Sequence, residues 1–132
     1  MKFLVVLFFV CLVGALAQEL NEAQRQRLRE HRDACIRETG ADRAEVDRAH
    51  RGDWADNPTI RCFALCMMKR LGLMSDDGKL NETAARQRLA LVLRRERVEE
   101  VMRKCKDLKG PTPCDTGYLI LKCYTDNRAN MV

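Results

Sequence analysis

Residues 105–123 read CKDLKGPTPCDTGYLILKC, a stretch in which three cysteines are separated by two intervals of eight residues. Between the first two cysteines, Gly110-Pro111-Thr112-Pro113 predicts a rigid connector, because proline fixes φ and the residue before a proline avoids the helical region. A helix is expected to end near Cys105, and another is expected from about Asp115 to Asp126. The stretch therefore predicts two helices joined by a stiff loop and rich in potential cross-links.

Three more cysteines lie upstream, at Cys35, Cys62 and Cys66. Asn57-Pro58 is a helix start signal, so Cys62 and Cys66 fall four residues apart on one face of a helix that stops at Gly72. Side chains one helical turn apart run side by side, which disfavours a mutual disulfide. Each should reach a different segment, but six cysteines allow fifteen pairings and the spacing alone selects none of them. A zinc site is disfavoured, because the chain has no CxxC pair with a nearby histidine.

The rest of the chain also predicts helices. A helical spacing of three to four residues separates Leu20, Gln24, Leu28, His31 and Cys35, and a short helix is expected over about Arg43 to His50. No proline or glycine interrupts residues 81–109, so periodicity alone allows one long helix or two helices joined near Arg94-Arg95. No segment alternates apolar and polar residues as a strand would. The fold class expected is therefore all-α, in a single domain.

The first seventeen residues predict a secretory signal. Lys2 precedes an apolar run from Phe3 to Val13, and Ala15-Leu16-Ala17 matches the small-x-small site cut by signal peptidase. Residues 1–17 are therefore set apart from the domain at 18–132. No later apolar stretch is long enough to cross a bilayer, so we expect a secreted, extracellular protein without membrane insertion. Cys11 leaves with the signal, and the even number of remaining cysteines predicts three disulfides.

Charge and motifs exclude several functions. Removing the signal leaves a net charge of +4, with basic and acidic side chains interleaved along the helices, which favours a solvated surface over a nucleic-acid interface. The sequence has neither G-x-S-x-G nor H-E-x-x-H, and three disulfides would leave no nucleophilic cysteine. We therefore expect no enzyme, no cofactor, no metal and no nucleic-acid partner.

The cysteine intervals of 26, 3, 38, 8 and 8 residues resemble the six-cysteine pattern of insect odorant-binding proteins, the pheromone and general odorant-binding family. The resemblance covers the whole domain. It implies six helices around a buried apolar cavity and the pairing Cys35–Cys66, Cys62–Cys114 and Cys105–Cys123. It also implies two helices within residues 81–109, with the break expected near Arg94–Arg97. The implied function is a carrier that reversibly binds small hydrophobic molecules such as odorants or pheromones, without catalysis.

Thirteen side chains are the candidate walls of this cavity, although ordinary core packing is the alternative for each one. Few aromatic residues and several methionines predict an aliphatic pocket that adapts to flexible chains. The Tyr124 hydroxyl could donate to a ligand carbonyl or alcohol, and the alternative is a hydrogen bond to the backbone. The partners considered are a small apolar ligand, an olfactory receptor and a second copy of the chain. The alternative function is a secreted signalling protein that uses its surface. The candidates are Leu28, Leu65, Met68, Leu71, Met74, Leu89, Leu93, Val98, Val101, Met102, Leu119, Leu121 and Tyr124.

Overall fold

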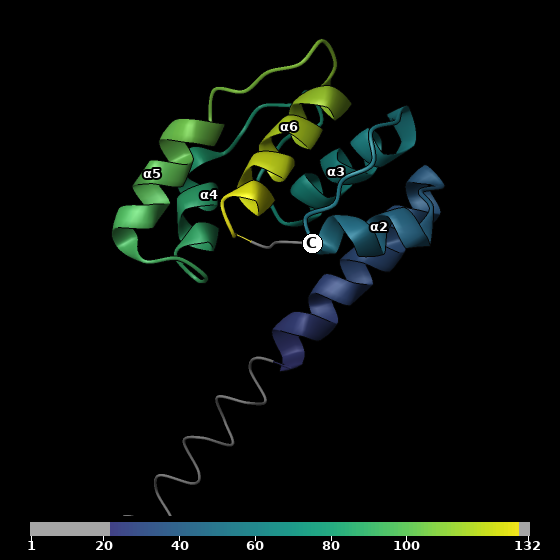
Figure 1. The fold of residues 1–132 in the computed structure, drawn as a ribbon, viewed down its shortest axis with the longest axis horizontal. Coiled ribbons are helices and arrows are strands. Elements are labelled where there is room, and N and C mark those ends of the chain that lie inside the picture. The colour runs from purple at the N-terminus through teal and green to yellow at the C-terminus, as the bar shows by residue number, and fades with distance from the viewer. Residues whose placement is uncertain (1–21, 130–132) are drawn as a thin grey trace, which may run out of the picture. The chain divides into compact units, whose positions relative to one another are not determined.

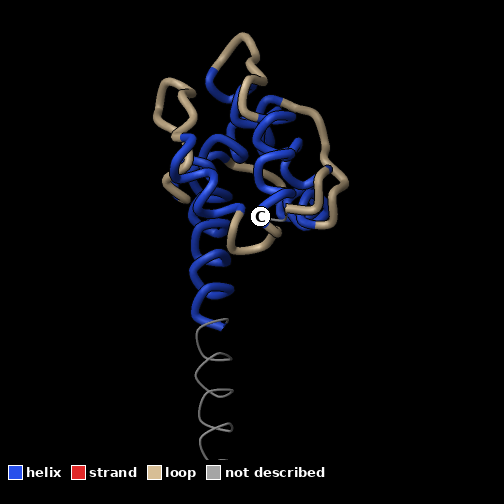
Figure 2. The backbone as a smooth tube through the Cα atoms, turned by 90° about the vertical axis from the view of Figure 1, so that its left-hand side faces the viewer, coloured by secondary structure: helices blue, strands red, loops and turns tan. Residues whose placement is uncertain are grey.

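The computed structural model describes residues 22–129, and within them the chain is helical and contains no named β-strand (Figures 1 and 2). The expected all-α class is confirmed. Residues 22–30 belong to one compact unit and residues 31–129 to another, and the packing below is that of the second unit. The predicted signal lies outside the described residues. The helices are the first helix over residues 22–39, α2 (Arg43–His50), α3 (Pro58–Arg70), α4 (Glu82–Leu89), α5 (Arg95–Cys105) and α6 (Pro113–Asp126).

Side-chain caps and prolines begin most of these helices. The side-chain oxygens of Asn57 and Asn81 accept hydrogen bonds from the backbone N–H groups of the first turns of α3 and α4, as expected of N-cap residues. Pro58 and Pro113 occupy the starts of α3 and α6, where the missing N–H has no helical partner to lose. Local sequence therefore sets where α3 and α6 begin.

The core is built around the contact between α3 and α6. α6 packs along α3 on one side and against α5 on the other, while α4 packs on α5 (Figure 1). Gly117 makes the close approach of α6 to α3 possible, because a Cβ built there would lie 2.9 Å from the Cα of Leu65. Glycine is required at this position for lack of space rather than for its backbone conformation.

Three disulfides join four of the helices. Cys35 of the first helix is bonded to Cys66 of α3, Cys62 of α3 to Cys114 of α6, and Cys105 of α5 to Cys123 of α6. These are the pairs that the family resemblance implies. The two cysteines of α3 reach different helices, as their shared face requires.

The break between α4 and α5 is real, but it begins four residues before the predicted range Arg94–Arg97 and overlaps that range only at Arg94. α4 ends at Leu89, the backbone forms a turn over residues 90–94, and residues 95–97 are already helical. The apolar residues after Leu89 form the turn, and the polar run opens the next helix. A straight helix over residues 82–105 would extend about 36 Å, too long for both halves to bury their apolar faces on this small core. Tertiary packing therefore breaks a helix that no proline or glycine interrupts.

The loop between α2 and α3 is fixed to α6. The indole N–H of Trp54 donates to the Thr125 hydroxyl at 2.8 Å, and the Trp54 ring meets the Tyr118 ring edge-on with centroids 5.7 Å apart. The Tyr118 hydroxyl donates to the Ala55 carbonyl at 3.0 Å. Arg61 adds ion pairs with Asp56 and Asp115.

No helix of the described part is long and apolar enough to cross a membrane.

Candidate functional site

Nine of the thirteen candidate wall residues are buried in the interior formed by α3 to α6 and the loop after α3. Leu71, Leu93 and Leu119 are half-buried at its margin, and Leu28 belongs to the separate unit. The interior therefore brings together flexible and branched aliphatic side chains from different helices. Their contact with a ligand stays a prediction. The nine buried residues are Leu65, Met68, Met74, Leu89, Val98, Val101, Met102, Leu121 and Tyr124.

Tyr124 supplies an unusual polar group to this interior. The side chain is fully buried, and its hydroxyl has no hydrogen-bond partner within the described part of the chain. Burial, helped by the negative charge of Glu82, raises the pKa of Tyr124 to about 12. A buried hydroxyl usually has a partner, since leaving it without one costs about 1–3 kcal/mol. Tyr124 is therefore a neutral donor that a bound ligand oxygen could satisfy.

The raised pKa of Tyr124 makes stability fall at alkaline pH. An unfolded tyrosine loses its proton near pH 10, whereas folded Tyr124 keeps its proton to about pH 12. The native state therefore binds more protons between these values, and the free energy of unfolding should fall by about 2 kcal/mol across them. Denaturant titrations at several pH values should show a loss larger by about this amount in the native chain than in Tyr124→Phe, in which burial still raises the pKa of Tyr118. Equal losses in the two proteins would contradict the assignment.

The interior also contains large side chains that the sequence did not assign to the walls. Ile60, Phe63 and Met67 of α3 are fully buried, as are Leu73 and Ile120. Helical spacing places Ile60, Phe63 and Met67 on one face, so periodicity could have found them. However, α3 is apolar on nearly all sides, because it lies at the centre of the fold. Periodicity alone cannot divide such a helix into a ligand face and a packing face.

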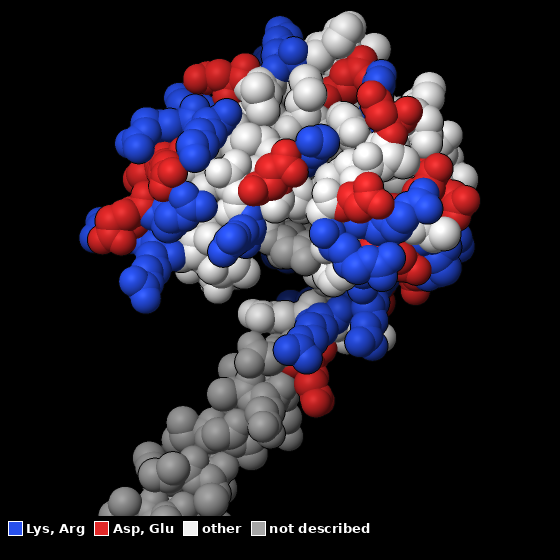
Figure 3. Space-filling view, viewed as in Figure 1, with Lys and Arg blue, Asp and Glu red and all other residues white. Residues whose placement is uncertain are grey.

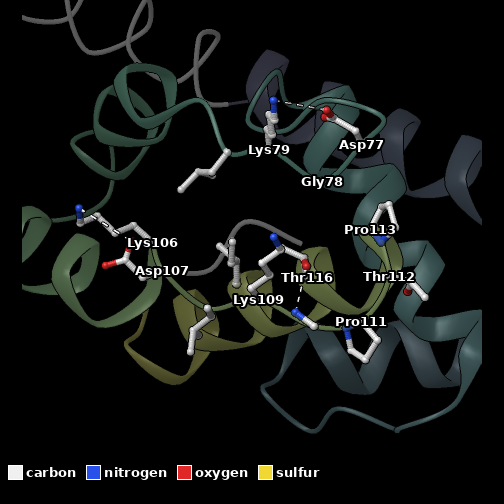
Figure 4. A pocket seen from close by; sticks show the side chains of 14 residues that line it. Asp77, Gly78, Lys79, Lys106, Asp107, Lys109, Pro111, Thr112, Pro113 and Thr116 are labelled. Carbon is white, nitrogen blue, oxygen red and sulfur yellow. Dashed lines mark hydrogen bonds and ion pairs between the residues drawn. The ribbon is translucent and has the colours of Figure 1, made fainter.

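A groove of about 380 Å³ lies on the surface between the turn at residues 77–80 and the connector before α6 (Figure 4). Thr116 and Ile120 of α6 also line it, and none of the candidate wall residues does. Its rim is charged, with Lys79 within 3.9 Å of Asp77 and Lys106 within 4.0 Å of Asp107. This groove therefore combines a charged rim with apolar side chains such as Leu80, Leu108 and Ile120, and it is separate from the candidate wall residues.

A second surface groove, of about 250 Å³, is lined by Arg61, Asp115 and the half-buried Leu119 among others. The hydrogen bond from the Thr112 hydroxyl, aided by Arg61, lowers the pKa of the Asp115 carboxyl. Arg61 also lies 5.9 Å from the centre of the Tyr118 ring. These charges are engaged with one another, so their role here is to hold the start of α6 against α3 and the loop between α2 and α3.

The zinc alternative for the cysteines is excluded by their bonding. Cys35, Cys62, Cys66, Cys105, Cys114 and Cys123 are all in disulfides, so none can offer a thiolate to a metal. Within residues 22–129, no three histidine, cysteine or acidic side chains gather as a metal site.

The fold and the core define a class of protein, a disulfide-linked helical domain with an aliphatic interior, and the comparisons name its family. The PBP/GOBP family model matches residues 17–127, so the chain belongs to the PBP/GOBP family. General odorant-binding protein 56a of Drosophila melanogaster is 29% identical over 118 residues, covering 88% of this chain and 84% of the relative. The B2 protein of Tenebrio molitor is 30% identical over 114 residues, covering 86% and 88%.

Solved structures agree with this assignment. The fatty acid binding protein OBP56a from the oral disk of the blowfly Phormia regina has a TM-score of 0.67 and 28% identity, covering 81% of this chain and 93% of that one. Odorant binding protein 4 of Chrysopa pallens has a TM-score of 0.70 at 19% identity, with coverage of 83% and 93%. The second likeness supports the fold alone.

Proposed function

We propose that this chain is a secreted carrier that reversibly holds a small apolar molecule in the interior between α3, α4, α5 and α6. Membership of the PBP/GOBP family supports the carrier role. The observation that carries the proposal is the buried group of methionine, leucine and valine side chains beside the unsatisfied Tyr124 hydroxyl. Apolar surface moved from water into such an interior gains roughly 25 cal/mol per Å².

The interior favours a flexible aliphatic ligand with one neutral oxygen. Buried Met68, Met74 and Met102 can adapt to chains of different shape, because methionine has three rotatable bonds and a polarizable sulfur. Thr116 is the only buried polar or charged residue of the described core apart from the tyrosines, so a buried carboxylate would find no fixed counter-charge there. The blowfly relative, described as a fatty acid binding protein, supports an aliphatic chain as the main part of the ligand.

The binding test uses an apolar fluorophore, N-phenylnaphthylamine, titrated into the oxidised protein and then displaced by competitors. Uptake of the fluorophore and its displacement by decanol are the expected results. No uptake would contradict the carrier function and favour the alternative, a secreted signalling protein that acts through its surface.

The role of Tyr124 is tested with Tyr124→Phe. Removing the hydroxyl should weaken decanol binding about fivefold, the value of one hydrogen bond, and leave the affinity for decyl chloride of the same chain length unchanged. Tyr118→Phe is the matched control, because the Tyr118 hydroxyl already donates to the Ala55 carbonyl. Equal effects of Tyr124→Phe on both ligands would contradict a ligand hydrogen bond while leaving the carrier function intact.

A further inference from the structure

The turn at residues 90–94, between α4 and α5, exposes apolar side chains that the core does not use. Leu91 is 68% exposed and Val92 54%, the two most exposed large hydrophobic residues of the described chain. Leu89 before them is fully buried and Leu93 after them is half-buried. The chain therefore turns an adjacent aliphatic pair towards solvent between two residues that face the protein.

This turn has a defined backbone. The N–H of Leu91 donates to the Arg88 carbonyl at 3.1 Å, and the N–H groups of Val92 and Leu93 donate to the Leu89 carbonyl at 3.1 and 2.9 Å. These bonds continue the end of α4 as a compact turn. The exposed pair is therefore held outward by the backbone and needs no rearrangement to meet a partner.

Basic side chains surround the exposed pair. Residues 86–97 contain five arginines and one acidic residue, Glu96. Arg86 is paired with Glu82 and Glu99, and Arg97 with Glu100. Arg94 and Arg95 are exposed and have no acidic partner within 4 Å in the part of the chain that the structure describes, whereas Arg88 of α4 is half-buried, which lowers its pKa. Over α5, on the left-hand side of the space-filling view, basic side chains are interleaved with acidic ones (Figure 3).

We propose that the 90–94 turn is a peripheral docking surface for an anionic lipid bilayer, with Leu91 and Val92 entering the headgroup boundary and the exposed Arg94 and Arg95 lying at the phosphates. In a membrane surface, anionic headgroups cover the acyl chains. The arginines of the turn would therefore meet the headgroups, and the exposed aliphatic pair would reach the boundary with the acyl chains. A second copy of the same turn would bring like charges together. The Arg97 guanidinium donates to the Asn127 carbonyl at 3.3 Å, so the first turn of α5, which follows the 90–94 turn, contacts the end of α6.

The test is cosedimentation of the oxidised secreted chain with vesicles. Vesicles that contain phosphatidylserine should bind the protein, whereas pure phosphatidylcholine vesicles should bind it far more weakly. Arg94→Gln with Arg95→Gln should reduce binding about thirtyfold, and added salt should reduce it in the native chain because it screens the arginines. Leu91→Asn with Val92→Thr should reduce binding about tenfold.

Matched controls separate the turn from general charge and hydrophobicity. Arg51→Gln with Lys109→Gln removes the same charge elsewhere, and Leu108→Asn removes an exposed apolar side chain that is 37% exposed in another loop. These variants should bind vesicles as the native chain does. All turn variants should take up N-phenylnaphthylamine normally, so failure of docking and failure of the carrier function are distinguishable.

Three results would overturn the proposal. The first is absence of binding to phosphatidylserine vesicles, which would indicate that the partner of the turn is an acidic protein surface. The second is binding that the turn variants leave unchanged. The third is a native dimer in gel filtration that Leu91→Asn converts to a monomer, which would assign the turn to self-association.

Discussion

Replacing Cys62 and Cys114 together with serine should lower the free energy of unfolding by about 4 kcal/mol. This disulfide links residues 52 apart in sequence, the longest of the three separations, and cross-linking a longer loop removes more conformational freedom from the unfolded chain. Because small domains are stable by only about 5–15 kcal/mol, the variant should be near the limit of folding. Urea denaturation followed by far-ultraviolet circular dichroism measures the difference.

The control is the paired replacement of Cys105 and Cys123 with serine. That disulfide joins residues 18 apart, so the chain-entropy argument gives it a smaller effect, about 3 kcal/mol. Replacing both partners in each variant avoids a free thiol that could exchange with the remaining disulfides. If the shorter link proved the more stabilising one, constraint of the unfolded chain would not be the main effect.

Gly117→Val should destabilise the chain by about 3 kcal/mol, because the new side chain meets the backbone of α3. A Cβ at this position would be 2.9 Å from the Leu65 Cα and 3.1 Å from its backbone nitrogen, so α6 would have to move away from α3. Overpacking of this kind costs about 1–3 kcal/mol, and a β-branched residue adds rotamer restriction within a helix. Thermal and urea denaturation both measure this loss.

A second substitution shows whether the backbone is the obstacle. Leu65→Ala keeps the nitrogen, Cα and Cβ that a Cβ at Gly117 would meet, so it should not rescue Gly117→Val. Because contacting residues usually couple, a double-mutant cycle in which Leu65→Ala recovers none of the stability lost in Gly117→Val would identify the α3 backbone as the obstacle. Clear rescue would mean that the outer part of the leucine side chain, rather than the backbone of α3, limits the approach.

Features set by local chemistry could be predicted from the sequence. Asn57-Pro58 marks the start of α3 because an asparagine cap and a proline in the first turn suit only a helix start. α2 begins and ends at the residues expected. The disulfide pairs needed the family resemblance, since residues far apart in sequence form them and no local pattern encodes that contact.

Features set by packing could not be predicted in the same way. The break after Leu89 lies in an apolar segment with good helical periodicity, and only the finite size of the core explains it. The missing partner of the Tyr124 hydroxyl depends on neighbours from other helices. Gly117 falls within a helical pattern, in which glycine is unfavourable. The requirement for glycine at this position becomes clear only from the short distance between α6 and the backbone of α3.

The hydrogen bond between Trp54 and Thr125 has an optical consequence. The chain contains a single tryptophan, and its indole is bonded to the residue that follows Tyr124 on α6. All intrinsic tryptophan emission of the protein therefore originates beside the end of one helix. Any displacement of that helix alters the surroundings of the only indole, which gives this domain a built-in fluorescent reporter without a label.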